Sequence, residues 1–420
     1  MNFDVSEVAF NGLRKRGRYY VLLVPYFPSP RYWNGAFFYN HARALRRAGL
    51  DVIVINLQYA GDDYEYGGLK IWPLAFDTRM AMLLGRWQDR SNYHKFVQCL
   101  NRHGVAIDEI AVIESGNIEN AGGVLCEVKR KNPKALTVTF MQDPDPYGCN
   151  KISARGNLGG WKRVLTYWRN RRLVESMDVI ATCSQNVARV VEEFPRQSVY
   201  NTFAPTVESM KELRKCRSGR VKRIIVLHNG VDTRVFNPEG HRKGGDVFEI
   251  GLIGHLWSHW FKDPMTLVRA MDLLKDKLGE WKLSFIGSGD CIQMVKDYAR
   301  ERGFEDRLCF YTEVDHRQLP DFYRQWDLFV LPSYWEAFGC VFTEAWSCGT
   351  PFITCKGQGM DDQIFQEDRQ LWLCNERDPV DLAEKILYFY RHRPAQRMAS
   401  PVDIDEITHD FLNEISKIPV

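Results

Sequence analysis

The amino-acid sequence predicts an α/β protein with two Rossmann-like domains that face each other across a cleft. Apolar runs of strand length alternate with amphipathic segments of helical period, which is the pattern of parallel sheets covered by helices on both faces. The alternation stops near residues 225–245 and then starts again, so we expect two separate sheets. The chain has 420 residues, 45% of them hydrophobic, which is enough for two or three buried cores.

In the first half, the alternation predicts five strands and five helices. The strands are apolar runs rich in β-branched residues, namely Tyr19–Val24, Asp51–Leu57, Glu109–Ile113, Leu136–Met141 and Asp178–Thr182. The helices carry apolar residues on one face and are expected at Ala36–Ala48, Met80–Leu100, Ala121–Lys131, 160–175 and Gln185–Glu193.

The second half repeats the pattern. Its predicted strands are Phe248–Ile253, Lys282–Ile286, Arg307–Tyr311, Leu328–Leu331 and Phe352–Thr354, with helices at 264–278, 290–302, 316–326, 342–348 and 379–391. We therefore expect an N-terminal Rossmann-like domain over residues 1–225, a C-terminal one over 226–395, and a helix within 396–420 that packs back on the N-terminal domain. Because ligands of such folds bind at the carboxyl ends of strands, we expect the site between the two domains.

Composition excludes several classes of protein. No run approaches about 18 apolar residues, so we expect no transmembrane helix. The segment MNFDVSEVAF lacks the basic start and apolar run of a signal peptide. The 11 cysteines contain no C-x-x-C pair, which favours reduced thiols over disulfides or a zinc knuckle. We therefore expect a cytoplasmic protein.

The charge is divided unevenly between the two halves. Residues 1–227 carry a net charge of +13 and residues 228–420 carry −10, so the first half is expected to meet an anionic partner. In helix 160–175, Lys162, Arg169 and Arg172 stand among aromatic residues, which favours peripheral contact with an anionic membrane. A solvated basic face and a soluble acidic acceptor are the alternatives. No nucleic-acid recognition motif accompanies the patch, so we expect no nucleic acid partner.

The segment 328–351 combines several features of a ligand site. After a buried strand, a loop presents Glu336, and Gly339 precedes a helix whose first N–H groups favour an anion such as phosphate. Glu344 lies one turn into that helix, where a carboxylate accepts hydrogen bonds from paired hydroxyls such as those of ribose. A nucleotide sugar offers diphosphate, ribose and sugar hydroxyls together. The alternative is a loop carboxylate at Glu336 and a solvated helix face at Glu344.

With its preceding Pro-Ser and following Gly-Thr-Pro, the E-x7-E segment resembles the signature of the retaining family 4 glycosyltransferases of GT-B architecture. Three further segments resemble family motifs in order and spacing: the N-G-V-D-x3-F turn at His228–Asp232 with Phe236, the donor diphosphate loop at Gly254–Leu256 with Lys262, and the G-x-G turn at Ile286–Gly289. The resemblance is strong over about 225–395 and weak in the first half. It implies retaining transfer of a sugar from a nucleoside diphosphate sugar to an acceptor hydroxyl.

The resemblance also implies a role for each matching residue. Glu336 matches the carboxylate that contacts the donor sugar near the reacting carbon, Lys262 matches the cation on the diphosphate, and Glu344 matches the ribose binder. The other donor-binding positions are Gly254 and His255 in the diphosphate loop, Val314 beside the base, and Phe338, Gly339, Cys340 and Val341, whose loop contacts sugar and phosphate through its backbone amides.

The match to the family is weaker on the acceptor side. The glycine-rich loop after the first strand is reduced to Asn34-Gly35, and Gln142 stands where the family often has a histidine. Asp143 is therefore our candidate for the acceptor-side catalytic group. His255 replaces an arginine and is expected to be a weaker, pH-dependent cation. With no nucleophilic carboxylate pair evident, we expect a front-face mechanism in which the leaving phosphate acts as the base.

Asp143-Pro144-Asp145 also matches a D-x-D motif, in which two carboxylates hold a divalent cation on a diphosphate. Because Lys262 and the helix start already supply phosphate neutralisation, we expect no metal and no cofactor besides a uridine or guanosine diphosphate sugar as co-substrate. One alternative is a non-catalytic glycosyltransferase-like protein that binds a nucleotide sugar or glycan, which His255 and Gln142 favour. A nucleotide-sugar epimerase is a third option, disfavoured by the E-x7-E segment.

Overall fold

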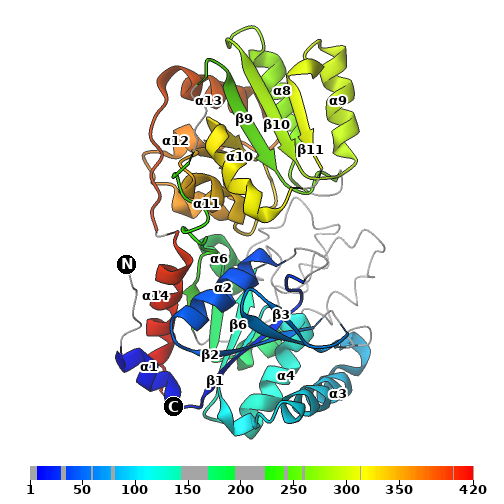
Figure 1. Ribbon diagram of the computed structural model, residues 1–420, viewed down its shortest axis with the longest axis vertical. Coiled ribbons are helices and arrows are strands. Elements are labelled where there is room, and N and C mark those ends of the chain that lie inside the picture. Colours follow the sequence, from blue (N-terminus) through cyan, green and yellow to red (C-terminus); the bar gives the residue numbers. More distant parts are fainter. Residues whose placement is uncertain are drawn as a thin grey trace. The chain divides into compact units, whose positions relative to one another are not determined.

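The computed structural model divides the chain into two compact units. The first comprises residues 1–228 and 404–420, and the second comprises residues 229–403. Within them the structure describes residues 7–29, 35–57, 60–76, 81–142, 169–193, 223–240, 245–257, 261–312, 314–400 and 402–419. Each unit is a largely parallel sheet covered by helices, which confirms the predicted α/β class (Figure 1).

The sheet of the first unit has eight strands in the order β3-β4-β2-β1-β5-β6-β7-β8, and only β3 runs antiparallel to its neighbour. The strands are β1 Tyr19–Val24, β2 Asp51–Asn56, β3 Tyr64–Tyr66, β4 Leu69–Pro73, β5 Ile110–Ser115, β6 Leu136–Met141, β7 Val179–Thr182 and β8 Ile224–Val226. β5 and β6 are buried along their whole length because helices cover both faces of the sheet. All five strands predicted for this half are present.

The hairpin β3–β4 was not predicted. Its turn is Gly67-Gly68, with φ of 58° and 77°, and Tyr66 pairs with Leu69 across it. A Gly-Gly pair between two strand-like runs is a hairpin signal, because both turn residues need positive φ. The strand Tyr64–Tyr66 is three residues long and partly exposed, so it has no apolar run to reveal it.

The helices of the first unit are α1 Glu7–Arg14, α2 Ala36–Arg47, α3 Ala81–Arg102, α4 Ile118–Lys131, α6 Gln185–Glu193 and α14 Ile404–Ser416, and residues 169–176 are also helical. α14 contacts α1 and α2, as Figure 1 shows. The chain just beyond α14 is held by Arg16, which donates to the carbonyl of Pro419 at 2.9 Å. The last described helix of the chain therefore belongs to the first unit.

A polar cluster is buried beneath α2. Glu114 on β5 is 1% exposed and His41 on α2 is fully buried. Oε2 of Glu114 accepts a hydrogen bond from the Tyr20 hydroxyl and lies 3.2 Å from Nε2 of His41. Burial and the neighbouring Glu114 raise the pKa of Tyr20 well above its usual value, so this hydroxyl remains a donor. The cluster joins β1, β5 and α2 inside the core.

The sheet of the second unit has six parallel strands in the order β11-β10-β9-β12-β13-β14. The strands are β9 Phe248–Ile253, β10 Trp281–Ile286, β11 Leu308–Tyr311, β12 Leu328–Val330, β13 Phe352–Cys355 and β14 Leu373–Cys374. In order of sequence this is the 3-2-1-4-5-6 arrangement of dinucleotide-binding folds. The prediction missed only β14, which is two residues long.

The helices of this unit are α8 Pro264–Leu274, α9 Cys291–Glu301, α10 Leu319–Gln325, α11 Cys340–Ser347, α12 Arg369–Trp372 and α13 Pro379–His392. α8 contacts α9 and α13, and these three helices cover one face of the sheet. α10 contacts α11, and this pair covers the other face (Figure 1). Gly251 in β9 makes room for a large core side chain, because a Cβ there would lie 2.1 Å from the ring of Trp326.

The nine cysteines of the described ranges are all free thiols. Within those same ranges, no helix has both the length and the apolar character that crossing a bilayer requires. The described part of the chain also holds no cluster of three or more His, Cys, Asp or Glu side chains able to bind a metal ion.

Candidate functional site

The candidate site lies in the second unit at the carboxyl ends of β9 and β12. These strands are neighbours, and the strand order reverses its direction between them. Open α/β sheets bind ligands beyond the strand ends at this switch point. Gly254 and His255 follow β9, and Glu336 lies in the loop after β12. The topology thus brings the predicted diphosphate loop and the predicted catalytic loop to one edge of the sheet.

The loop after β9 packs closely against the loop after β10. The N–H of Gly254 donates to the carbonyl of Ile286 at 3.0 Å. A Cβ on Gly287 would lie 2.0 Å from the carbonyl oxygen of Gly254, and one on Gly289 would lie 2.0 Å from the backbone of Leu256. The glycines of the G-x-G segment are therefore required by the close approach of two backbones, which fixes the predicted diphosphate loop.

Replacing Gly287 by alanine is expected to lower the free energy of unfolding by about 3 kcal/mol, because the new Cβ overlaps backbone at a φ of 134°. The matched control is Gly303→Ala, where φ is 74° but nothing lies within 4 Å, so that the loss is about 1 kcal/mol of backbone strain. Denaturant unfolding of both variants checks this. Equal losses of unfolding free energy in the two variants would show that the loop after β10 can move away from the loop after β9 without loss of stability.

Asp263 stands where the family carries a glycine after the lysine. It has φ 45° and ψ 59°, a left-handed conformation that glycine adopts freely and aspartate tolerates. Its carboxylate accepts hydrogen bonds from the N–H of Thr266 at 3.2 Å and from the Thr266 hydroxyl at 2.6 Å. The departure from the family pattern thus keeps the backbone geometry and adds an N-cap to α8, directly after Lys262.

Lys262 and Glu336 form an ion pair in which Nζ of Lys262 donates to Oε2 of Glu336. Their side chains are 19% and 13% exposed, so solvent screens the attraction less than at an open surface. The pair connects the start of α8 with the loop after β12. The structure therefore brings these two predicted catalytic residues into direct contact.

The backbone of Glu336 is held on both sides by the segment after β13. Its N–H donates to Oε1 of Gln358 at 2.8 Å, and its carbonyl accepts from the N–H of Gly359 at 3.0 Å. Nε2 of Gln358 in turn donates to Oε1 of Glu376 at 2.8 Å. Sequence reasoning missed Gln358 and Glu376, although both follow the carboxyl ends of strands and so lie where the fold places ligand sites.

Helix α11 begins directly after Gly339, which has φ 86° and caps the helix without a side chain. The first N–H groups of α11, at Cys340 and Val341, therefore lie at an uncapped helix start, which favours an anion. Phe338, which precedes Gly339, is buried, with 1% of the whole residue exposed. Burial raises the pKa of the Cys340 thiol to about 12, which keeps it protonated and unsuited to act as a nucleophile.

Glu344 is buried in α11, and both of its carboxylate oxygens have protein partners. Oε1 lies 2.9 Å from Nε2 of His316, and Oε2 accepts from the Tyr323 hydroxyl at 2.9 Å. The His316 ring lies 5.1 Å from the ring of Phe236, the aromatic residue of the N-G-V-D-x3-F segment. The alternative of a solvated helix face is wrong, because Glu344 is 4% exposed. Sequence reasoning missed His316 and Tyr323, which precede β12 and carry no motif of their own.

His255 and Val314 lie at the edges of this region. Burial of the imidazole and the positive charge of Lys262 lower the pKa of His255 from its usual 6.5. The neutral form of the ring therefore predominates at pH 7, so that this predicted donor-binding residue would offer hydrogen-bonding nitrogens rather than charge. Val314 is half-buried and lies between β11 and a 3-10 turn at His316–Gln318.

The predicted acceptor-side residues are only partly described. Gly35 is the N-cap of α2 with φ 85°, and a Cβ there would lie 2.9 Å from the carbonyl oxygen of Tyr26. Gln142 directly follows β6. Asn34 and Asp143, with the rest of the D-x-D segment, lie outside the described residues. Gly35 is thus required by its positive φ and by the close approach of Tyr26. The acceptor-side catalytic group stays a prediction.

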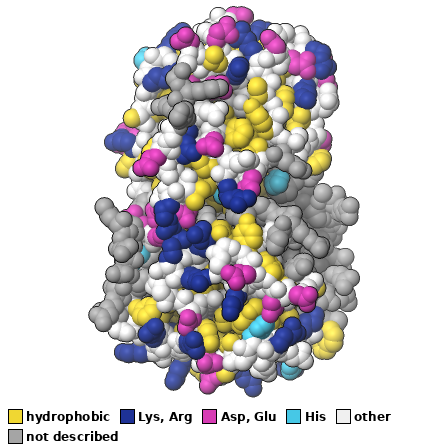
Figure 2. Space-filling view, in the orientation of Figure 1, with side chains coloured by type: hydrophobic (Ala, Val, Ile, Leu, Met, Phe, Trp, Pro, Cys, Tyr) yellow, Lys and Arg dark blue, Asp and Glu magenta, His cyan; other side chains and the backbone are white. Residues whose placement is uncertain are grey.

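The predicted basic patch of helix 160–175 is also only partly described. Lysine and arginine side chains outnumber acidic ones on the visible face of the first unit (Figure 2). Arg169, however, donates to Oδ1 of Asp89 at 2.7 Å and to the carbonyl of Glu119 at 3.0 Å, and its side chain is 15% exposed. The expectation that Arg169 faces a membrane is wrong, because it is committed to this ion pair. Arg172 is exposed, and Lys162 lies outside the described residues.

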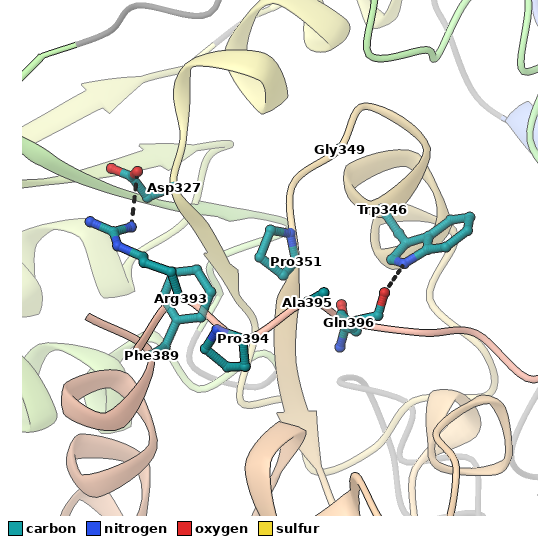
Figure 3. A pocket seen from close by; sticks show the side chains of 9 residues that line it. All are labelled: Asp327, Trp346, Gly349, Pro351, Phe389, Arg393, Pro394, Ala395 and Gln396. Carbon is teal, nitrogen blue, oxygen red and sulfur yellow. Dashed lines mark hydrogen bonds and ion pairs between the residues drawn. The ribbon is translucent and has the colours of Figure 1, made fainter. Parts of the chain in front are cut away.

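The second unit also has a cavity of about 620 Å³. It lies at the amino ends of the strands, opposite the candidate site at their carboxyl ends. Asp327 and Pro351, which line it, precede β12 and β13 (Figure 3). Its polar groups are engaged within the protein: Asp327 pairs with Arg393 at 2.9 Å, and the Trp346 indole donates to the carbonyl of Gln396 at 3.2 Å. Because the strands begin here, this cavity is not our candidate site.

Comparison with known proteins places the second unit in a family. Residues 236–401 match the sequence model described as glycosyl transferases group 1. A D-inositol 3-phosphate glycosyltransferase 2 of Catenulispora acidiphila is 38% identical over 200 residues, which are 44% of this chain and 46% of the relative. A D-inositol 3-phosphate glycosyltransferase of Xylanimonas cellulosilytica is 26% identical over 198 residues, again 44% and 46% of the two chains. The match thus spans less than half the length of these curated relatives.

Solved structures resemble the whole chain in fold. A sucrose-phosphate synthase from Thermosynechococcus elongatus has a TM-score of 0.63 at 16% identity and 94% coverage of both chains. The Anabaena protein HepE, in complex with UDP and glucose, has a TM-score of 0.59 at 15% identity, covering 95% of this chain and 99% of its own. The catalytic domain of starch synthase IV from Arabidopsis thaliana has a TM-score of 0.60 at 14% identity and 96% coverage of both. At such identities the likeness concerns the fold.

Proposed function

Because residues 236–401 match the model of glycosyl transferases group 1, we propose that the chain is a family 4 glycosyltransferase of GT-B architecture, which transfers a sugar from a nucleoside diphosphate sugar to an acceptor hydroxyl with retention at the anomeric carbon. The observation that carries this proposal is the convergence of Lys262, Glu336 and the uncapped start of α11 at the switch point of the second sheet. A cation, a carboxylate and free N–H groups at one sheet edge match the diphosphate and the hydroxyls of such a donor.

In the proposed reaction the bond between the anomeric carbon and the diphosphate oxygen breaks, and the acceptor oxygen bonds to the same face of that carbon. The acceptor proton passes to the leaving phosphate. Negative charge grows on the diphosphate as the bond breaks, so Lys262 and the N–H groups at the start of α11 stabilise the transition state more than the ground state. Glu336 orients the sugar and balances the positive charge that develops at the anomeric carbon.

We propose a uridine or guanosine diphosphate sugar as the donor and no metal in the reaction. The HepE structure contains UDP and glucose, which supports the uridine type. We expect UDP-glucose or GDP-mannose to raise the melting temperature in the presence of EDTA, since a ligand at a hundredfold its Kd stabilises a protein by about 2.7 kcal/mol. Differential scanning fluorimetry with EDTA and with Mn²⁺ is the measurement. A response that requires Mn²⁺ would overturn the metal-independent proposal.

The acceptor is proposed to be a hydroxyl of a glycan, a lipid-linked molecule or a small molecule. The relatives named for D-inositol 3-phosphate match less than half of this chain, so their acceptor is not carried over. A non-catalytic protein that binds a nucleotide sugar remains the second candidate, favoured by the neutral His255 in place of the family arginine. Release of UDP from UDP-glucose in the presence of a cell-extract acceptor pool separates the two, because a binding protein gives no turnover.

We also propose that the protein contacts an anionic membrane peripherally. Of the three basic residues named for this contact in helix 160–175, Arg172 is the one that the structure describes as exposed. We expect salt-sensitive flotation with vesicles that contain phosphatidylserine, reduced by Arg172→Glu. Arg169→Glu is the contrasting variant, because it breaks the ion pair with Asp89 and should lower stability instead. Equal flotation with neutral and anionic vesicles would contradict the proposal that the protein contacts the membrane through its positive charge.

A further inference from the structure

Glu336 can orient a sugar only if its loop is held in place, because the residue lies beyond the end of β12 and outside any helix. The ion pair with Lys262 holds the carboxylate, but the proposed reaction requires Lys262 to serve the diphosphate. The position of Glu336 must then be maintained through its backbone. Two groups after β13 do this: Oε1 of Gln358 accepts from the Glu336 N–H at 2.8 Å, and the N–H of Gly359 donates to the Glu336 carbonyl at 3.0 Å.

The backbone of Gly359 lies very close to the catalytic loop. A Cβ on Gly359 would lie 2.1 Å from the carbonyl oxygen of Ala337 and 2.4 Å from the Cα of Phe338. The segment after β13 therefore packs along residues 336–338, and the Gln358 side chain extends that contact to the N–H of Glu336. A change in this segment is transmitted directly to the loop.

The amide of Gln358 has a defined orientation. Its oxygen accepts from Glu336, and its nitrogen donates to Oε1 of Glu376 at 2.8 Å. Glu376 is a carboxylate that accepts but does not donate, so it selects the amide orientation in which oxygen faces Glu336. A flipped amide would present a donor to the Glu336 N–H and lose both bonds.

We propose that Gln358 is a positioning residue for the donor-sugar carboxylate, and that Glu376 orients Gln358 for this task. Through this chain of two hydrogen bonds Glu376 fixes the backbone of Glu336, and Gln358 keeps that residue aligned when Lys262 turns to the diphosphate. The inference rests on the proposed function, because it assigns a role to the residues around the same site.

A second glutamine provides a matched control. Both ends of the Gln396 amide are hydrogen-bonded too, in this case to one backbone residue: the oxygen accepts from the N–H of Phe352 and the nitrogen donates to the carbonyl of Phe352, each at 2.9 Å. Its partner Phe352 is the first residue of β13, and Gln396 lines the cavity at the amino ends of the strands (Figure 3). Gln358→Ala and Gln396→Ala therefore remove similar pairs of hydrogen bonds at opposite ends of one strand, and only the first is expected to affect the donor sugar.

The test compares binding of UDP with binding of UDP-glucose, by calorimetry, and donor turnover. We expect Gln358→Ala to leave the Kd for UDP within threefold, to remove the additional affinity that glucose confers, and to lower kcat about tenfold with a smaller change in KM. Gln396→Ala should lower the melting temperature without either effect. Gln358→Glu should behave like Gln358→Ala, because it places a carboxylate opposite Glu376.

The double variant Gln358→Glu with Glu376→Gln decides whether the hydrogen bonds themselves matter. It exchanges donor and acceptor, so that the carboxylate introduced at position 358 accepts from both the Glu336 N–H and the amide introduced at position 376. We expect this exchange to restore kcat to within threefold of the original protein. If UDP-glucose and GDP-mannose neither bind nor turn over with the original protein, the proposed function fails and the inference falls with it. If the original protein turns over but Gln358→Ala matches Gln396→Ala, or the exchange does not rescue, the inference alone is overturned.

Discussion

Glu336→Gln is expected to lower kcat by about a hundredfold or more while the affinity for UDP does not fall. The amide keeps the shape of the side chain but removes the negative charge that balances the developing positive charge at the anomeric carbon. It also removes the ionic partner of Lys262, which leaves that cation free for the diphosphate. Steady-state kinetics with UDP-glucose, together with UDP binding by calorimetry, measures both effects.

Glu344→Gln is the companion variant and should act on donor affinity instead. Glutamine can still accept from Tyr323 and donate to His316, so the local structure is kept, but an amide binds a ribose diol less well than a carboxylate does. We expect KM for the donor to rise about tenfold with kcat changed by less than threefold. Small and equal effects of the two variants on kcat and KM would mean that both carboxylates have only a structural role.

Glu114→Ala should cost about 3–5 kcal/mol of stability, because it leaves His41 and Tyr20 in the core without their common partner. The Nδ1 atom of His41 already has no hydrogen-bond partner among the described residues, so the network has no replacement for the lost contact. Urea unfolding of the full chain, followed by tryptophan fluorescence and far-UV circular dichroism, reports the loss as a lower midpoint of the transition.

The control for this variant is Asp51→Asn, which breaks the ion pair between Asp51 and Arg18 at 2.9 Å on the first unit. These side chains are 56% and 63% exposed, so solvent already screens their attraction and the midpoint should hardly move. A Glu114→Ala protein as stable as the Asp51→Asn protein would mean that water enters the cluster and replaces the carboxylate.

Sequence periodicity was sufficient for the longer buried strands because buried parallel strands are continuous apolar runs. β1, β6 and β9 begin and end at the residues that the hydrophobic pattern indicated. The pattern failed where burial is incomplete or an element is very short, as in the hairpin at Gly67-Gly68 and the two residues of β14. Such elements are specified by turn geometry and tertiary contacts, which apolar periodicity does not record.

The candidate site was predictable to the extent that its residues belong to motifs. Glu336 and Glu344 were identified from their spacing around a helix start and Lys262 from the resemblance to a family motif, and the structure places Lys262 and Glu336 in contact. Gln358 and His316 were not identified, because each contacts its site glutamate only through a hydrogen bond that joins residues more than 20 positions apart in the sequence. The neutral state of His255 was also beyond the sequence, since it depends on burial and on the distance to a charge.

The contact between Lys262 and Glu336 has a consequence for which anions the site accepts. The lysine is already occupied by an internal competitor, so an incoming anion gains only the difference between its own attraction and that of the carboxylate. A lone phosphate that displaces Glu336 leaves this carboxylate half-buried without a counter-ion. A nucleotide sugar brings both a diphosphate for the cation and hydroxyl donors for the carboxylate, so it satisfies the two former partners at once. If the site binds a nucleotide sugar as proposed, the pair would favour the complete donor over a lone phosphate or a free nucleotide.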